Sequence, residues 1–291
     1  MKNLINYYYN ILIEEIRKVD DYYVIYSNNY RYALINFNYD LNYLKKIYYI
    51  MMSNNVFCHE IVINSFGNII TSYNNNNYIL IKFKLDKEDI NYNDILNYSF
   101  IVYEEENFSW KPLWESKIDY YEYQVNQMGY KYKTVKESFN YYIGLSENAI
   151  SLLNYIDTSK LVYSISHRRI DVKGTDSFYN PINLIIDCRV RDIAEYYKIN
   201  FFNDNLDSDD IIKYISEINI NKNEAIAFFS RLLYPSYYFD LYDDIIQEKS
   251  NDEKLNKIIK KSTSYEILLK KIYLMFKYKY QIPEIEWLES N

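Results

Sequence analysis

YSISHRRIDVKGTDSFYNPINLIIDCRVRDIAEYYK, residues 163–198, is the stretch that decides the fold. It contains His167, one of only two histidines in the chain. A short apolar run, Leu184–Ile186, ends at Asp187, and helical spacing follows at Arg191, Asp192 and Glu195. The pattern predicts a strand with a carboxylate at its end, which leads into a helix and lies downstream of a loop that begins with histidine.

The size and charge of the chain exclude several classes of protein. Its 291 residues suit one large domain or two tightly joined lobes. The net charge of −7 gives no basic footprint for nucleic acid. Cys58 and Cys188 form no metal-binding pattern and suggest a reducing compartment. With no signal-peptide core and no apolar run near the ~20 residues that span a bilayer, we expect a soluble protein made in the cytoplasm, without a membrane span.

Tyrosine is unusually abundant and glycine unusually scarce, at 38 and 4 residues. The tyrosines indicate either a surface suited to adhesion and oxidative cross-linking or the codon bias of an AT-rich genome. A loop that wraps phosphates needs several glycines, because the backbone must approach the ligand closely. The four glycines are scattered, so we expect no Gly-rich nucleotide loop; they are Gly67, Gly129, Gly144 and Gly174.

The N-terminal part reads as a small sheet with one packed helix. A helix is predicted over residues 3–18, and then two strands, Tyr22–Tyr26 and Tyr30–Phe37, joined by a turn at Ser27-Asn28-Asn29, since Asn tolerates positive φ. Asn38 or Asp40 caps a helix to about Met52. Three more strands are predicted, over 61–64, 68–73 and 78–85.

From about residue 87 the periodicity becomes helical. One helix is predicted over 89–96, and a second begins at Trp110, enters through Pro112 and continues through Val125. Further helices are predicted over 141–156 and, after the opening stretch, over 208–219, 222–234, 237–248, 252–261 and 264–280. Asn221 and Ser264 are candidate N-caps. The sequence therefore predicts an α+β class and two lobes, with an antiparallel-sheet N-lobe at 1–86 and a mainly helical C-lobe at 87–291 that contains the insert 163–198.

Four strings carry a family resemblance. They are Ser109-Trp-Lys-Pro-Leu-Trp-Glu-Ser-Lys-Ile-Asp119, Tyr142-Ile-Gly-Leu-Ser-Glu-Asn-Ala-Ile150, the opening stretch, and Arg231-Leu-Leu-Tyr-Pro235. In this order they resemble the bilobal, protein-kinase-like fold of aminoglycoside and choline phosphotransferases, and within it the spore coat kinase-like branch of the CotS and YutH type. The resemblance covers roughly residues 20–250.

The resemblance implies a set of phosphotransfer residues, and several positions depart from it. Such kinases use a strand lysine paired with a helix glutamate to hold the phosphates. In the matching string Ala33-Leu-Ile-Asn36, Asn36 stands at the lysine position, and the following helix has Lys45 and Lys46 but no glutamate. An amide cannot neutralise phosphate charge, so this pair is predicted to be lost.

The catalytic loop departs in the same way. Its base should follow the histidine by two residues, yet His167 is followed by Arg168 and Arg169, and arginine accepts no proton. Asp171 or Asp176 could act only as a displaced base. The strand-end Asp187 matches the metal-binding position, and Asn183 is a second candidate metal ligand.

Each candidate also has a structural interpretation. His167 can be a turn histidine bonded to backbone. Arg168 and Arg169 can pair with Asp187, Asp192 or Glu195, with guanidinium charge in place of a metal. The aromatic string Tyr234–Phe239 is predicted to be core rather than a ligand cage.

Three functions remain open from the sequence. The first is a degenerate kinase-like protein, a pseudokinase, with an assembly or scaffolding role among other coat or scaffold proteins of a spore, and with no cofactor. The second is an active phosphotransferase on a small molecule or protein, which would use Mg-ATP. The third is a tyrosine-rich structural coat protein. The spore location and the partners are implied by the resemblance alone.

Overall fold

The structure is a computed structural model and describes residues 1–291 except 20–21, 85–88, 104–107, 129–130, 171–174 and 290–291, and except the side chains of 175–176. Its contacts divide the chain into two compact units. Unit 1 comprises Met1–Val102 and Ser164–Ile186, and unit 2 comprises Tyr103–Tyr163 and Asp187–Asn291. Ser164–Ile186 thus clusters with the sheet. The predicted lobe boundary at 86/87 stays a prediction.

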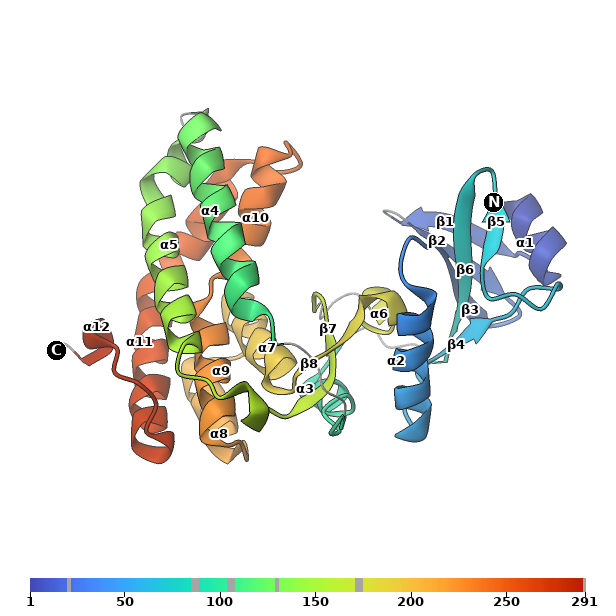
Figure 1. The fold of residues 1–291 in the computed structure, drawn as a ribbon. Helices are drawn as coiled ribbons and strands as arrows, with labels where there is room; N and C mark the ends of the chain where they lie inside the picture. Colours follow the sequence, from blue (N-terminus) through green and yellow to red (C-terminus); the bar gives the residue numbers. More distant parts are fainter. Residues whose placement is uncertain (20–21, 85–88, 104–107, 129–130, 171–174, 290–291) are drawn as a thin grey trace. The chain divides into compact units, whose positions relative to one another are not determined.

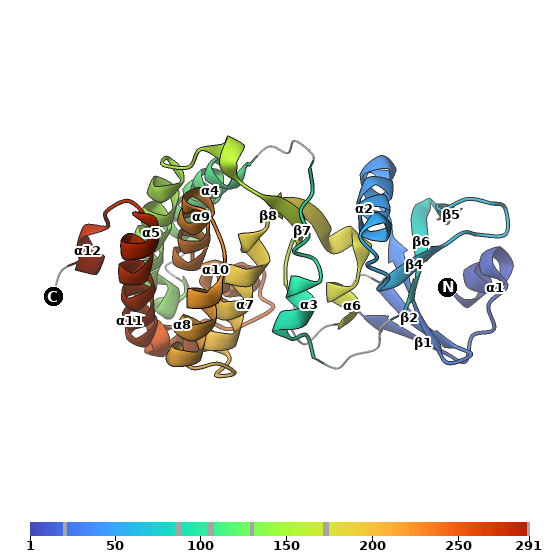
Figure 2. The ribbon, with the colours of Figure 1, turned by 90° about the horizontal axis from the view of Figure 1, so that it is seen from below.

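Unit 1 is built on an antiparallel sheet of order β1-β2-β3-β6-β4, with β5 paired to β6. Its strands are β1 (Glu15–Val19), β2 (Tyr22–Ser27), β3 (Tyr30–Asn36), β4 (His59–Val62), β5 (Thr71–Tyr73) and β6 (Asn76–Phe83). The sheet lies between helices α1 (Lys2–Tyr9) and α2 (Leu41–Ser53) in both views of the ribbon (Figures 1 and 2). This is the predicted sheet with a packed helix.

Alternation along the strands explains how both sides of the sheet are buried. Leu4 and Ile5 of α1 pack in one cluster with Ile25, Leu34 and Leu80. The intervening residues of β3 and β6, among them Ala33, Ile79 and Ile81, are buried too. Because successive strand residues point to opposite faces, the central strands are covered on both sides.

The first predicted helix was too long. Residues 3–18 were expected to be helical, but α1 ends at Tyr9 and β1 begins at Glu15. Asn10 adopts a left-handed conformation, with φ of 50°, and this ends the helix. The following residues pair with β2 in register, Ile16 opposite Ile25. Pairing with a neighbouring strand therefore outweighed the helical spacing of the apolar residues.

Asparagine makes the tight turns of unit 1. Asn28 and Asn29 join β2 to β3 with φ of 48° and 63°, and Asn74 and Asn75 join β5 to β6 with φ of 49° and 60°. Positive φ at both central residues fits the twist of a two-residue hairpin. Asp40 caps α2 by accepting the Asn42 N–H at 2.8 Å, as predicted.

The rest of unit 1 contains a short helix, α3 (Tyr92–Leu96), and most of the strand pair β7 (Tyr163–His167) and β8 (Leu184–Cys188), whose outer ends are counted in unit 2. Between these two strands lie α6 (Thr175–Phe178) and a 3-10 turn, η3 (Pro181–Asn183). The predicted strand at Leu184–Ile186 is thus present as β8, and unit 2 begins at Asp187 near its end.

Unit 2 is helical. Its helices are α4 (Trp110–Met128), α5 (Lys133–Leu153), α7 (Val190–Phe202), α8 (Ser208–Glu217), α9 (Lys222–Leu233), α10 (Ser236–Ile246), α11 (Leu255–Tyr280) and α12 (Glu286–Glu289), with short 3-10 turns η2 (Thr158–Lys160) and η4 (Asp252–Lys254). Helix α9 contacts α5, α7 and α11 and lies among them (Figure 1). Nearly all of its residues are buried, so it forms the centre of this unit.

Two cap predictions for unit 2 have different outcomes. Asn221 caps α9 in a capping box with Glu224, as predicted. Ser264 is not a cap, because it lies inside one helix, α11, which runs without a break from Leu255 to Tyr280, and its hydroxyl instead donates to the Lys261 carbonyl oxygen. Serine inside a helix can bond backward in this way without ending it.

Tyrosine packs the core of unit 2. The rings of Tyr142 and Tyr238 stack with centroids 3.8 Å apart, and Tyr242, Tyr265 and Tyr273 are also fully buried. Tyr234, Tyr238 and Phe239 are buried, so the aromatic string is core, as expected. No helix among the described residues is long and apolar enough to cross a membrane.

Candidate functional site

The candidate site in unit 2 is centred on Asp187, the carboxylate at the end of β8. Its two oxygens accept from the Trp110 indole N–H at 2.9 and 3.0 Å. Oδ2 also accepts from Arg191 Nη1 at 2.7 Å, and Oδ1 from the Cys188 backbone N–H at 2.7 Å. A carboxylate offers about four acceptor positions. The Asp187 carboxylate therefore accepts four hydrogen bonds from three protein donors.

Local structure explains two of these donors. Asp187 lies in β8 just before α7, and Arg191 lies in the first turn of that helix, so the short strand-to-helix connection brings the two side chains together. Trp110 is the first residue of α4 and is 1% exposed, so its indole N–H needs a buried acceptor. Both partners of the ion pair are nearly buried, with side chains 10% and 12% exposed.

A second carboxylate, Glu195, lies one turn farther along α7. It accepts from Arg231 Nε of α9 at 2.5 Å, pairs with Lys198 at 2.9 Å, and accepts from the Ser236 hydroxyl at 2.9 Å. The Lys198 ammonium also donates to the carbonyl oxygens of Arg231 and Tyr234. This network joins α7, α9 and the start of α10.

Burial and the neighbouring opposite charge shift the pKa values of Glu195 and Lys198 in opposite directions. Burial alone would raise the pKa of Glu195, but the charges of Lys198 and Arg231 and the hydrogen bond from Ser236 lower it to about 2. Burial lowers the pKa of Lys198 to about 8, although Glu195 opposes this shift. Burial and the neighbouring charge of Arg231 also lower the pKa of Arg191. At neutral pH the carboxylate is charged and lies between cations.

An aromatic stack lies against one of these cations, Arg231. Trp110 and Trp114 stack with centroids 5.4 Å apart, and Trp114 stacks on Tyr234 at 4.2 Å. The Arg231 guanidinium lies 5.1 Å from the Trp110 ring and 5.6 Å from the Trp114 ring. Cation–π contact of this kind holds a desolvated guanidinium in place. Trp110 therefore serves both the Asp187 carboxylate and the neighbouring cation.

The candidate residues on the catalytic-loop segment lie in unit 1. His167 is 1% exposed, and its Nε2 lies 3.0 Å from the Phe178 carbonyl oxygen. Its ring stacks on Phe178 at 4.1 Å and meets the edge of Tyr98 at 5.0 Å. The expected backbone bond of a turn histidine is present.

Asn183 also bonds to backbone. Its Oδ1 accepts from the Arg169 N–H at 3.2 Å, and its Nδ2 donates to the carbonyl oxygens of Arg169 and Ser177. The amide thus fixes the loop against η3. Arg168 and Arg169 are exposed in this unit, whereas the guanidinium on Asp187 comes from Arg191. Asp171, the displaced-base candidate, lies outside the described residues, as does the side chain of Asp176.

The lysine position is at the end of β3. Asn36 pairs there with Tyr78 of β6, and its buried Oδ1 has no hydrogen-bond partner among the described residues. The helix after β3, α2, contains no glutamate that could pair with a lysine. In the described part of the chain, no three His, Cys, Asp or Glu side chains form a group able to hold a metal ion. Asn36 therefore supplies no positive charge at the position where a kinase holds its phosphate-binding lysine.

Comparison with known proteins places these features in a family. The family model "Spore coat putative kinase YutH" matches residues 2–272. The chain belongs to this family. The endospore coat-associated protein YutH of Bacillus subtilis (strain 168) is 26% identical over 208 residues, which cover 62% of this chain and 61% of that protein. The alignment with this relative therefore spans less than two thirds of its length.

Solved structures support the fold of this YutH-family chain. An aminoglycoside phosphotransferase from Alicyclobacillus acidocaldarius subsp. acidocaldarius DSM 446 superposes with a TM-score of 0.68 at 10% identity, covering 96% of each chain. A spectinomycin phosphotransferase in complex with ADP and spectinomycin gives 0.53 at 12% identity, covering 94% of this chain and 97% of that one. The predicted kinase-like α+β fold and its spore coat branch are thus confirmed.

Sequence reasoning did not find most partners in this YutH-family site. Trp110 was recognised only as a helix entry, although it binds Asp187 across 77 residues of sequence. Arg191 could have been considered because it is a cation four residues after Asp187, at the start of the predicted helix. Among the partners of Glu195, Lys198 is three residues along the same helix, whereas Arg231 and Ser236 lie outside α7, so no local pattern indicates these two.

Proposed function

We propose that this YutH-family protein is a pseudokinase that has an assembly or scaffolding role in the spore coat. The observation that carries the proposal is the occupation of Asp187 by Trp110, Arg191 and the Cys188 N–H. In an active kinase the corresponding carboxylate holds the metal that bridges the phosphates. Here the same carboxylate holds the start of α7 to the start of α4.

Freeing Asp187 for a metal would be costly. The carboxylate would have to leave Arg191, a cation that is itself 9% exposed and lies near the charge of Arg231. Breaking a buried pair by removing one partner costs about 3–5 kcal/mol. The Trp110 indole would lose its acceptor as well. The free energy of metal binding must exceed these costs before any phosphate is bound.

The contacts in unit 1 support the same proposal. Asn36 supplies no positive charge at the lysine position, and Asn183 uses its amide oxygen and nitrogen on backbone. His167 lies against Phe178 in a buried cluster. We infer that these residues hold the loop in shape, that no cofactor is needed, and that Asp187 and Asn183 are not metal ligands.

The family supports a proposal about the location and partners of this chain. The described relative is named as endospore coat-associated, so we propose that this chain is made in the cytoplasm and joins other coat proteins. Its acidic charge argues against nucleic acid as a partner.

A cross-linking role for tyrosine would use exposed rings such as Tyr103 and Tyr278, which are 91% and 92% exposed, and would appear as dityrosine after peroxide treatment.

Thermal unfolding with and without Mg-ATP tests the pseudokinase proposal. A ligand at 100 times its Kd adds about 2.7 kcal/mol of stability, which would raise the Tm by roughly 5 °C or more. We expect no Mg-dependent shift and no ATP turnover. A Mg-dependent shift that Asp187→Asn abolishes would support an active enzyme instead, with Asp171 or Asp176 as its base.

The same variant separates the two roles of Asp187 without any ligand. In a carboxylate kept for metal, removing the negative charge relieves repulsion and stabilises the fold. In the paired site, Asp187→Asn removes the partner of Arg191, and we expect a loss of about 2–3 kcal/mol. Asp119→Asn, on a helix of the same unit, is the matched control. A stabilising Asp187→Asn would contradict the proposal.

A further inference from the structure

One edge of the unit 1 sheet is formed by β1. This strand is the first in the order β1-β2-β3-β6-β4 and, among the described residues, pairs with β2 alone. It lies at the border of the sheet in the ribbon (Figure 2). The outer N–H and C=O groups of an edge strand can pair with a strand from another chain. The β1 edge is therefore a candidate site for one more strand.

The charges along this edge are arranged in two blocks. Residues 13–19 read Ile-Glu-Glu-Ile-Arg-Lys-Val, with two acids before Ile16 and two bases after it. Glu14 directly precedes β1, and its Oε1 accepts the Asn28 N–H at 3.0 Å, which holds this carboxylate beside the sheet. One half of the edge is therefore negative and the other half positive.

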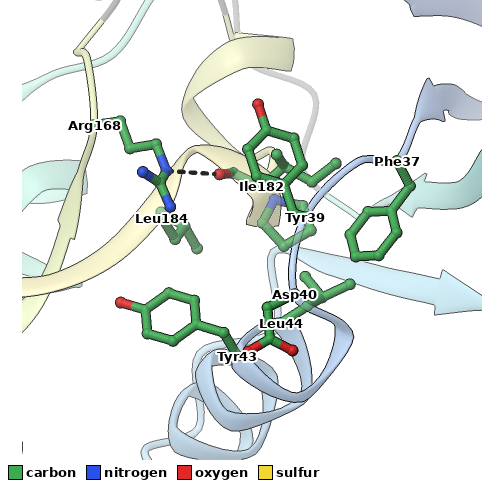
Figure 3. A pocket seen from close by; sticks show the side chains of 9 residues that line it. Phe37, Tyr39, Asp40, Tyr43, Leu44, Arg168, Ile182 and Leu184 are labelled. Atoms are coloured by element: carbon green, nitrogen blue, oxygen red, sulfur yellow. Dashed lines mark hydrogen bonds between the residues drawn. The ribbon is translucent and has the colours of Figure 1, made fainter.

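Other parts of unit 1 lack this separation of charge. The opposite edge of the sheet, β4, contains Glu60 but neither lysine nor arginine. A cavity of about 250 Å³ lies between the end of β3, the start of α2 and η3, and Asp40 and Arg168 both line it (Figure 3). That cavity presents both signs of charge to a ligand, whereas β1 presents them in a fixed order along one strand.

A second copy of β1 fits this order when the two strands run antiparallel about a two-fold axis at Ile16. In that register each acid lies opposite a base, and each apolar residue lies opposite an apolar one. The opposed pairs are Glu15 with Arg17, Glu14 with Lys18, Ile13 with Val19, and Ile16 with Ile16. Opposite charges directly across an antiparallel pair stabilise it, and like charges destabilise it.

Other registers lose this match. A shift by one residue places Ile16 opposite Glu15 or Arg17, and a shift by two places Arg17 opposite Arg17 or Glu15 opposite Glu15. A parallel pairing in register brings like charges together at every charged position. The order of the charges therefore specifies one antiparallel register, which the symmetry of a two-fold dimer permits.

The side chains that would meet are accessible. Glu15 and Arg17 point to the same face, form an ion pair within β1, and have side chains that are 49% and 63% exposed. Ile16 points to the other face, where it is half-buried against the apolar cluster beneath α1. Pairing of two copies would join the two ion pairs into a group of four alternating charges and would extend the apolar cluster across the axis.

We propose that two copies of this chain associate through β1, antiparallel about Ile16, and form one continuous sheet. Charged residues on an edge strand usually prevent pairing, because a second strand brings unmatched charges together. Here the order of the charges makes the edge complementary to itself. The same patch serves both copies, so the contact closes as a dimer. This interface does not depend on the pseudokinase proposal, since neither Asp187 nor Asn36 takes part in it.

Analytical ultracentrifugation of the full chain tests the proposal. We expect a monomer–dimer equilibrium with a Kd of about 0.1 mM or tighter, as for a small transient interface. Salt screens exposed charges, so association should weaken roughly threefold or more between about 50 mM and about 500 mM NaCl. A monomer at every concentration up to about 1 mM, or a dimer that salt does not weaken, would overturn the proposal.

Two charge reversals provide variants that should pair with each other but not with themselves. Arg17→Glu opposes acid to acid across the axis, and Glu15→Lys opposes base to base. Each should weaken self-association by roughly tenfold or more. In an equimolar mixture every reversed charge faces its complement, so the mixture should associate about as tightly as the unmodified chain. A mixture that stays monomeric would contradict the register, and a change within one strand alone could not restore association between two variants.

The other edge of the sheet supplies a matched control. Glu60→Lys makes the same charge change on β4, where the Glu60 side chain is also 49% exposed and pairs with Lys84. It should leave the dimer Kd unchanged, whereas Glu15→Lys should raise it. Equal effects of the two variants would show that the net charge of the chain decides association, and would overturn the assignment to β1.

Cysteine cross-linking tests the position of the axis. Ile16→Cys places two thiols directly opposite each other, so mild oxidation should link the copies. Lys18→Cys places its thiol opposite Glu14 instead, and should cross-link on the order of tenfold less, because a disulfide needs Cβ atoms about 4 Å apart. The native Cys58 and Cys188 are buried and should not compete. Stronger cross-linking through Lys18→Cys would indicate another register and overturn the one proposed.

Discussion

The two places where a kinase fold would hold Mg-ATP have changed in different ways. In unit 2 the strand-end carboxylate is retained, and protein donors surround it. In unit 1, Asn36 stands at the lysine position, and its Oδ1 has no partner among the described residues. A retained charge must be neutralised by new contacts, whereas a lost charge requires none. Asp187 is therefore held by protein donors, whereas Asn36 contains a buried oxygen without a partner among the described residues.

The strongest test of this comparison removes the centre of the unit 2 network. Glu195→Gln leaves Lys198 and Arg231 without their anion in a buried setting. Breaking a buried pair costs about 3–5 kcal/mol, and we expect that loss in denaturant unfolding. Glu137→Gln breaks an exposed pair with Lys133 and should change stability by less than about 1 kcal/mol. Similar effects of the two variants would show that the network is not a structural core.

The pH dependence of stability also tests the pairing of Glu195. The pKa of Glu195 falls from 4.5 to about 2 on folding. Its contribution to the free energy of unfolding is therefore fully present above pH 4.5 and is lost as the pH falls toward 2. The shift corresponds to about 3 kcal/mol. Other carboxylates titrate in this window, so the relevant quantity is the stability difference between the unmodified chain and Glu195→Gln. That difference should shrink between pH 4.5 and 2, and a constant difference would contradict the pairing.

The smallest expected effect is in unit 1. Asn36→Val replaces a buried acceptor without a partner by a β-branched side chain on a strand, and should stabilise the chain by about 1 kcal/mol. Equilibrium unfolding measures the gain. Asn38→Val, just after β3, is the control and should give little change. Destabilisation by Asn36→Val would show that its amide is needed, and the contrast between the units would fail.

Much of this architecture could be predicted from local pattern. The hairpin at Asn28-Asn29, the caps Asp40 and Asn221, and the strand that ends at Asp187 all follow from residues adjacent in sequence. The error at residues 3–18 came from a helical spacing that sheet pairing outweighed. Most partners of Asp187 and Glu195 could not be predicted from the sequence. Trp110, Arg231 and Ser236 come from other helices, and only packing brings them together.

The asparagine turns of unit 1 have a consequence at the level of the gene. Every glycine codon begins with two guanines, whereas asparagine codons begin with two adenines, and asparagine is the residue after glycine that best tolerates the left-handed conformation. By using Asn10, Asn28, Asn29, Asn74 and Asn75 where positive φ is required, the chain forms its turns without GC-rich codons. A gene under strong base-composition bias toward A and T can thus encode these turns, and the hairpins of the protein still form.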